Sequence, residues 1–223
     1  MIEPQPSIYI SGIRIDEPMT TLTDFLVSAV CLYAFFKLSQ HSGKSRALTY
    51  LRMYFLLMAL ATFFGGLIGH AFLYAFGFAW KLPGWIISMI SVAFIERSAI
   101  DYSRIYIKAR TVNFFLIVNI LELITIMSLT LSSLNFKWVE FHSGYGLLGV
   151  VLPFHLYIYL KTKDHGSLLM IVAVGIASIA ALIFMTKFSL HTWFNYLDFS
   201  HVVMAIGAFV FYKATLRLKT IAQ

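Results

Sequence analysis

The chain has 223 residues, of which 60% are hydrophobic, 17% aromatic and only 12% charged. Soluble domains are typically about 45–50% apolar and about 25% charged, so a soluble fold of this composition could not cover its own surface with polar groups. We therefore expect an integral membrane protein. The net charge of +7 does not indicate a nucleic-acid partner, because the basic residues are distributed as a membrane topology requires.

Seven long apolar segments with short polar connections predict seven transmembrane helices. One crossing takes about 20 apolar residues, and short connections make consecutive helices antiparallel neighbours in an up-down bundle. The sequence thus predicts an all-α polytopic membrane protein with one seven-helix transmembrane domain at 21–219. An extracytoplasmic segment at 1–20 precedes it, and the end of a cytoplasmic tail at 220–223 follows it. The expected helices cover about 21–38, 48–76, 80–98, 112–133, 138–160, 167–186 and 194–216.

The basic residues predict the orientation of the bundle. If the N-terminus lies outside, only four of the 17 Lys and Arg residues fall on the outer side, namely Arg14, Lys81, Lys137 and Lys187. Cytoplasmic loops are enriched in Lys and Arg, so the predicted topology is N-out and C-in. The positive charge is then a topology signal and a contact with anionic lipid headgroups.

The segment before the first helix has two possible structures. In SIYISGIRI, apolar and polar residues alternate around Ser11-Gly12, which is typical of a small hairpin. Such a hairpin would lie over the outer mouth of the bundle. A disordered tail is the alternative.

Each ionisable group inside a predicted helix raises the free energy of membrane insertion by about 2.5–3.5 kcal/mol. We therefore expect each one to have a structural or functional role. Counting about 1.5 Å per residue places five of them in one layer in the outer half of the bundle. Glu122 lies near mid-depth and His155 in the inner half. The five groups of the outer layer are Asp24, His70, His142, Asp198 and His201.

Two local patterns suggest that this layer faces the interior. In the last helix, Asn195, Asp198 and His201 recur every three residues and therefore stay near one face. In the second helix, the glycines of GGLIGHAF precede His70, and glycines let neighbouring membrane helices approach closely.

Three imidazoles and two carboxylates are suitable ligands for zinc. We expect His70, His142 and His201 to be metal ligands, with Asp24 and Asp198 orienting a histidine or acting as general base. A hydrogen-bonded polar cluster without metal is one alternative. The other is a proton or ion relay, for which the further candidates are Asn195, Glu122 and His155.

Several other polar groups suggest structural roles. His155 follows Pro153 and is expected to bond backbone carbonyls freed by the proline. Glu122 with Asn119 is expected to form half of an interhelical hydrogen bond. The pairs Glu96–Arg97 and Asp101–Arg104 are expected at the inner interface, facing solvent or headgroups.

The segments TLTDF, GGLIGHAF and NYLDFSHVVMA resemble an uncharacterised family of bacterial seven-helix proteins, which implies the bacterial inner membrane as host. More distantly, the layout is similar to the superfamily of alkaline ceramidases, progestin/adipoQ receptors and myomaker-like proteins. That resemblance implies a membrane hydrolase with a zinc site built by a Ser-x-x-x-His in helix 2, a carboxylate and a His-x-x-x-His in helix 7.

The match to the superfamily pattern is partial. His70 matches the helix-2 histidine, but Gly66 stands in place of its serine. His201 matches the second helix-7 histidine, whereas Leu197 stands in place of the first, and Asp198 is the nearest substitute.

The expected function is therefore a zinc-dependent hydrolase that cleaves an amide or ester bond of a membrane lipid. Three alternatives stay open: a non-enzymatic scaffold or subunit of a protein partner, a haem-binding protein with paired axial histidines, and a proton-coupled transporter. No nucleic-acid partner is expected.

Overall fold

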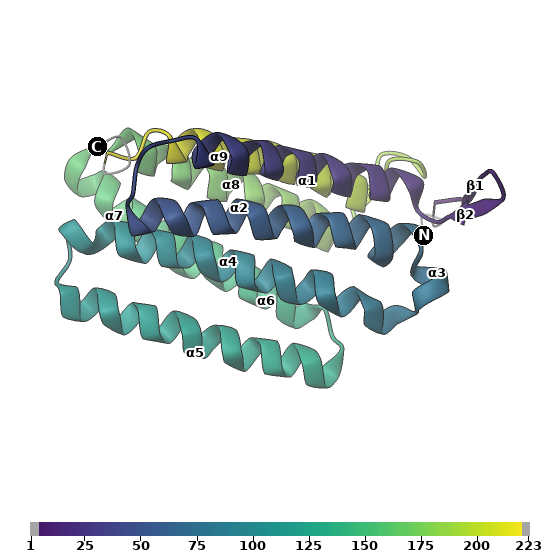
Figure 1. The fold of residues 1–223 in the computed structure, drawn as a ribbon, viewed down its shortest axis with the longest axis horizontal. Helices are drawn as coiled ribbons and strands as arrows, with labels where there is room; N and C mark the ends of the chain where they lie inside the picture. The colour runs from purple at the N-terminus through teal and green to yellow at the C-terminus, as the bar shows by residue number, and fades with distance from the viewer. Residues whose placement is uncertain (1–4, 220–223) are drawn as a thin grey trace.

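The computed structural model describes residues 5–219, and it is a bundle of long helices with a small hairpin at one end (Figure 1). The hairpin strands are β1 (Ile8–Ile10) and β2 (Ile13–Ile15). The long α-helices are α1 (Pro18–Ser39), α2 (Arg46–Phe64), α4 (Leu82–Tyr102), α5 (Ala109–Ser133), α6 (Lys137–Gly144), α7 (Leu152–Thr162), α8 (His165–Thr186) and α9 (Tyr196–Thr215). Shorter elements are η1 (Gly65–Ala71), α3 (Leu73–Phe76), η2 (Phe78–Lys81), η3 (Ser103–Ile105) and η4 (Tyr145–Val151).

The predicted number of helices is confirmed: seven helical stretches of the described chain are long and apolar enough to cross a membrane. They cover Pro18–Ser39, Arg46–Ala71, Phe78–Ile105, Ala109–Ser133, Lys137–Thr162, His165–Thr186 and Tyr196–Thr215. The largest difference from the prediction is in the third stretch, which continues to Ile105 instead of ending near 98. Groups near residue 96 therefore lie two turns deeper in the bundle than the sequence suggested.

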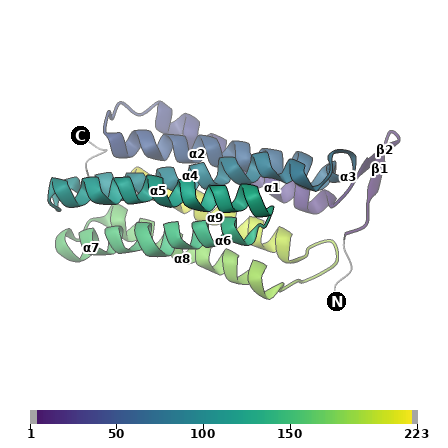
Figure 2. The same ribbon diagram turned by 90° about the horizontal axis from the view of Figure 1, so that it is seen from below.

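Consecutive helices pack side by side, and the last helix returns to the first. α1 contacts α2, α2 contacts α4, and α4 contacts α5; on the other side, α7 contacts α8, α8 contacts α9, and α9 contacts α1. α4 also packs against η4, so α5 lies at the edge of the bundle, where only 17% of its most apolar window is buried. Figure 1 shows α5 along the lower edge of the bundle, and in Figure 2, seen from below, α5 lies at the front.

The core changes character along the bundle. The largest fully buried apolar side chains lie mostly in the half that holds the C-terminus, and they include Leu38, Leu51, Ile100, Ile158 and Phe211. Buried threonine, asparagine and aspartate side chains gather instead near the hairpin end, at the start of α1 and of α9. The hairpin end is therefore rich in buried polar groups, although Asp164, Ser167 and Thr215 are buried polar residues near the opposite end.

The N-terminal segment forms the hairpin rather than a disordered tail. Ile8 pairs with Ile15 and Ile10 with Ile13 in an antiparallel register. Ser11 and Gly12 turn the chain with φ of 50° and 81°, as a two-residue turn with both central residues at positive φ requires. The Tyr74 hydroxyl donates to the carbonyl of Arg14 at 3.0 Å, which fastens the hairpin to the end of the bundle.

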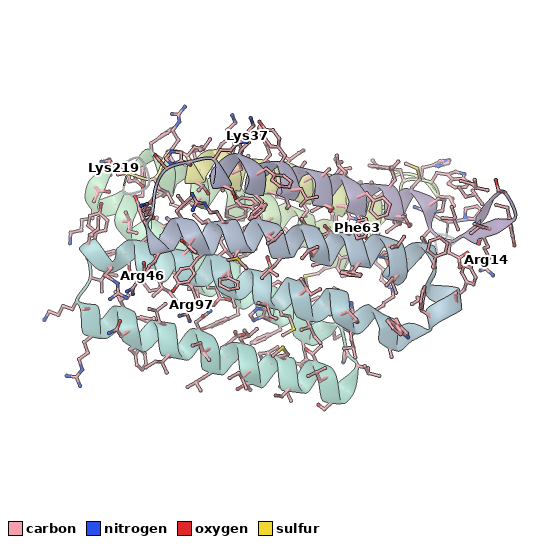
Figure 3. All side chains as sticks on the ribbon, in the orientation of Figure 1. Arg14, Lys37, Arg46, Phe63, Arg97 and Lys219 are labelled. Carbon is pink, nitrogen blue, oxygen red and sulfur yellow. The ribbon has the colours of Figure 1, made fainter. Side chains whose placement is uncertain are left out.

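Basic side chains are distributed unequally between the two ends of the bundle. Figure 3 shows Arg46 and Lys219 at the end opposite the hairpin, and Arg14 at the hairpin end. The chain therefore keeps in three dimensions the asymmetry read from the sequence.

We predict that Gly166→Ala destabilises the protein by about 1–3 kcal/mol, the usual cost of overpacking. A Cβ at Gly166 would lie 2.6 Å from the backbone nitrogen of Leu218, and that backbone cannot move aside as a flexible side chain would. Thermal unfolding in detergent measures the effect. Gly175→Ala on the same helix is the matched control, because its Cβ would meet nothing within 4 Å. Equal melting temperatures for the two variants would contradict the prediction.

Candidate metal centre

Asp24 lies between two histidines that come from other helices, and we name Asp24, His70 and His201 the hairpin-end centre. One carboxylate oxygen of Asp24 is 3.8 Å from Nε2 of His70, and the other is 3.6 Å from Nε2 of His201. Both distances are too long for hydrogen bonds. They are slightly longer than the separation of about 3.3–3.4 Å between two ligand atoms on a tetrahedral zinc ion.

The other ring nitrogen of each histidine is bound to a neighbouring side chain. Nδ1 of His70 pairs with the carboxylate of Glu17, and Nδ1 of His201 lies 3.2 Å from the hydroxyl of Thr23. That hydroxyl donates its proton to the carbonyls of Met19 and Thr20 within α1, so it accepts from His201. Carboxylates and hydroxyls that hold Nδ1 in this way fix the tautomer of metal-binding histidines.

These tautomers place an acceptor nitrogen of each ring near Asp24. With Nδ1 protonated on both neutral rings, His70 and His201 each present an Nε2 lone pair within 3.8 Å of a carboxylate oxygen of Asp24. Asp24 is buried, with 7% of its side chain exposed, and the two histidine side chains are 15% and 12% exposed. A buried carboxylate beside two such lone pairs needs a cation or protons nearby. A carboxylate and two imidazoles are ligand types that zinc accepts.

A close approach of two helices brings Asp24 into place. A Cβ on Gly66 would lie 2.9 Å from Cβ of Asp24 and 3.1 Å from the carbonyl oxygen of Thr21. The hydroxyl of Thr21 donates to the carbonyl of Gly66 at 3.3 Å. Gly66 and His70 both belong to the π-helical turn η1, a feature that is frequent at functional sites. The glycines were expected to let neighbouring helices approach closely, and Gly66 does so between η1 and α1.

Glu17 lies beside the hairpin-end centre, bound to His70, and is not one of the candidates drawn from the sequence. It lies just before Pro18, the first residue of α1, in the left-handed region with φ of 43°. Few non-glycine residues adopt this conformation, and strained backbone is often found at functional sites. The hydrogen bond from His70 holds the pKa of Glu17 below its ordinary range. Glu17 lies outside the predicted helices, so its position in the sequence did not mark it as a buried ionisable group.

Asp198 lies near the hairpin-end centre, but its oxygens are engaged elsewhere. They accept from Gln5 Nε2 at 2.6 Å, from the Thr20 hydroxyl at 2.9 Å and from the backbone N–H of Asn195 at 2.7 Å. The side chain of Asn195 accepts from the backbone N–H of Leu197 at 2.8 Å. Asn195 and Asp198 thus form the capping box of α9, a structural role. This geometry gives no support to the expected catalytic role of Asp198.

His142 does not join His70 and His201, so the expected single layer of five groups is corrected. Its Nδ1 is 2.9 Å from both carboxylate oxygens of Glu122, and its Nε2 is 2.9 Å from the carbonyl of Met89. The reason is helix rotation: α6 packs against α4 and α5, and His142 faces those two helices. The expected interhelical bonding of Glu122 and Asn119 is present: Glu122 pairs with His142, and Asn119 donates to Glu96 at 3.1 Å.

Two further expectations need correction. Glu96 is fully buried, with 0% exposure, because α4 continues past the residue where the helix was predicted to end. His155 bonds the hydroxyl of Ser167 at 3.1 Å, in place of carbonyls freed by Pro153. The expected pair of Asp101 and Arg104 is present, at 3.0 Å.

The geometry defines a bundle of seven apolar helices with a candidate metal centre at one end. The chain belongs to DUF6962, a family of unknown function, whose model matches residues 19–220. No curated protein and no solved structure matches the chain. The residues of the site must therefore carry the functional argument.

We predict that Glu17→Gln lowers the melting temperature at pH 7 by about 2–4 °C, as the loss of about 1 kcal/mol does in a chain of this size. Because the pKa of Glu17 is lowered in the folded state, its contribution is complete above the ordinary glutamate pKa of about 4.3. It is lost as the pH falls through the lowered folded-state pKa. The difference between the two proteins should therefore shrink below about pH 4.

Thermal unfolding from pH 3.5 to 7, with a chelator present throughout, measures this difference. Glu140→Gln is the matched control, because Glu140 makes no side-chain hydrogen bond within the described residues. A difference that stays constant over the whole pH range would contradict the assignment of Glu17.

Proposed function

We propose that the protein is a metal-dependent hydrolase of membrane lipids and that zinc is its metal. The observation that carries the proposal is the position of the Asp24 carboxylate between Nε2 of His70, at 3.8 Å, and Nε2 of His201, at 3.6 Å. Two imidazoles and a carboxylate are a zinc ligand set that leaves a fourth position open for water or substrate. Compared with the ligand set expected from the sequence, Asp24 takes the place of His142.

The chain's own residues would hold and tune the site. Glu17 and Thr23 keep the Nε2 lone pairs of His70 and His201 directed at the bound ion. Asp24 neutralises part of the ion's charge. A zinc ion in such a site activates water as a nucleophile near neutral pH and polarises a carbonyl oxygen.

The position of the centre suits a lipid substrate. Asp24 lies six residues into α1, or about 9 Å from the start of the helix. The headgroup region on each side of a bilayer is about 5–8 Å thick, so the centre would lie where headgroups meet acyl chains. Ester and amide bonds of membrane lipids are found at this depth. The substrate would thus be a lipid ester or amide, and the partner of the protein would be the lipid bilayer.

The distribution of basic residues supports insertion with the N-terminus outside and the C-terminus inside. In that orientation the hairpin-end centre faces the outer leaflet. The expected host, the bacterial inner membrane, rests on the sequence resemblance alone. The proposed chemistry agrees with the distant resemblance to the alkaline ceramidase superfamily, which singled out His70 and His201.

A structural role is the second candidate, and the network of Asp198 favours it. Gln5, Thr20 and Asn195 satisfy this carboxylate and tie the N-terminal segment and α1 to α9. A scaffold protein needs such links and needs no metal.

We expect protein purified without chelator to contain zinc, and we expect the double variant His70→Ala/His201→Ala to contain one equivalent less per chain. Elemental mass spectrometry measures the content, and lipid ester and amide hydrolysis in mixed micelles should be lost with the metal. His165→Ala is the matched control, because His165 is exposed at the start of α8. Equal zinc content in wild type and double variant would overturn the proposal, and a Soret absorbance band would indicate haem instead.

We also expect Thr23→Val to weaken zinc binding by about 10–100-fold, the usual cost of losing a partner of a metal-binding histidine. Thr23→Ser keeps the hydroxyl that accepts from His201, so its affinity should stay close to that of the wild type. Competition with a calibrated chelator measures both affinities. Equal weakening by valine and serine would show that the hydroxyl plays no part in the site.

A further inference from the structure

A second group of ionisable side chains lies away from the hairpin-end centre, and it shares no residue with it. Glu96 from α4, Glu122 from α5 and His142 from α6 each offer one ligand atom, and these atoms all lie within 4.8 Å of one another. We name these three residues the mid-bundle cluster. Glu96 and His142 are both 0% exposed.

The bonds of His142 orient its ring. The carbonyl of Met89 can only accept, so Nε2 of His142, at 2.9 Å, carries a proton. In the neutral ring, Nδ1 then presents a lone pair to the two oxygens of Glu122. A histidine whose second nitrogen donates to a backbone carbonyl is oriented as metal-binding histidines are. A cation or a proton must lie between Nδ1 and the carboxylate.

Glu96 provides an independent observation. One of its oxygens accepts from Asn119 at 3.1 Å, and Arg97 in turn donates to Asn119 at 3.1 Å. The other oxygen, Oε1, is buried and has no hydrogen-bond partner within residues 5–219. A buried carboxylate oxygen without a partner is costly. This oxygen therefore needs a positive partner of its own.

Gly146 makes room for that oxygen. A Cβ on Gly146 would lie 2.5 Å from Oε1 of Glu96 and 2.7 Å from Val92. Gly146 belongs to the π-helical turn η4, which begins three residues after His142. The backbone thus leaves space for the carboxylate of Glu96 between α4 and η4.

Glu122 lies at the outer side of the cluster. It is the one member of the three that is partly exposed, with 12% of its side chain accessible. It lines a mostly apolar groove of about 350 Å³ on the outside of α5 and α6, together with Val118, Leu121, Phe141 and Tyr145. The cluster therefore lies close to the outer surface of the bundle.

We propose that the mid-bundle cluster binds a divalent transition-metal cation, of the zinc, iron or manganese class, through Glu96, Glu122 and His142. Carboxylate and imidazole ligands suit these metals. The cation takes the position between Nδ1 of His142 and the two carboxylates, and it supplies the positive partner that Oε1 of Glu96 lacks. The proposal is independent of the hydrolase function, because the two sites use different residues of different helices.

The test uses the full-length protein in detergent, in a background that carries Asp24→Asn, His70→Ala and His201→Ala. Equilibrium dialysis against Zn²⁺ should leave one ion per chain on this background. Adding Glu96→Gln should weaken that binding at least about tenfold, because it replaces a ligating carboxylate by an amide of the same size. Glu140→Gln on α6 is the matched control and should change nothing. No bound zinc on the background, or equal binding after Glu96→Gln, would overturn the proposal and leave a proton as the shared cation.

A second measurement does not depend on the folding of the Glu96 variant. Co²⁺ added to the background protein should give visible ligand-field bands that Zn²⁺ abolishes, and absence of the bands would contradict the proposal. The two proposals can be overturned separately. If the background binds as much zinc as the wild type, the hydrolase proposal fails; if it binds none, the mid-bundle proposal fails.

Discussion

The structure depends on one requirement: acceptor groups buried in an apolar bundle must be paired with hydrogen-bond donors or a cation. A carboxylate placed among apolar helices costs several kcal/mol unless donors or a cation satisfy it. The chain meets this requirement at Asp198 with three hydrogen-bond donors. At Asp24 the neighbours are two imidazole lone pairs, and at Glu96 one oxygen has no partner within the described residues. Asp198 therefore has a structural role, and the other two carboxylates are the ones proposed to bind a cation.

Both binding-type clusters lie next to a π-helical turn that contains a closely packed glycine. Gly66 in η1 lets α1 approach, and Gly146 in η4 makes room for Glu96. A π-helical turn adds a residue to the helical repeat and so rotates the side chains that follow it. In this protein the two turns set the direction in which His70 and the helix after His142 face. Small residues and irregular turns therefore do the positioning that loops do in many soluble enzymes.

The sequence predicted the features that depend on composition and local pattern. These are the seven helices and the Ser11-Gly12 hairpin as one of two possibilities. The sequence also pointed to Asp24, His70 and His201, which lie near one another in the structure. It did not predict which groups share a site, because helix rotation depends on packing between distant segments. His142 was placed with the wrong partners for this reason. Glu96 was missed because the end of α4 was set too early, and Glu17 because it lies outside the apolar segments.

The bond between Thr23 and His201 joins residues 178 positions apart in the chain, and this separation sets an order of assembly. Asp24 enters the bundle with the first helix, long before the ribosome has made α9. The hairpin-end centre can be completed only when synthesis is nearly finished, whereas Glu96, Glu122 and His142 are all present once α6 is made. Until α9 arrives, the newly made chain carries Asp24 without one of its two histidines. A chain truncated before α9 therefore retains this incomplete centre permanently.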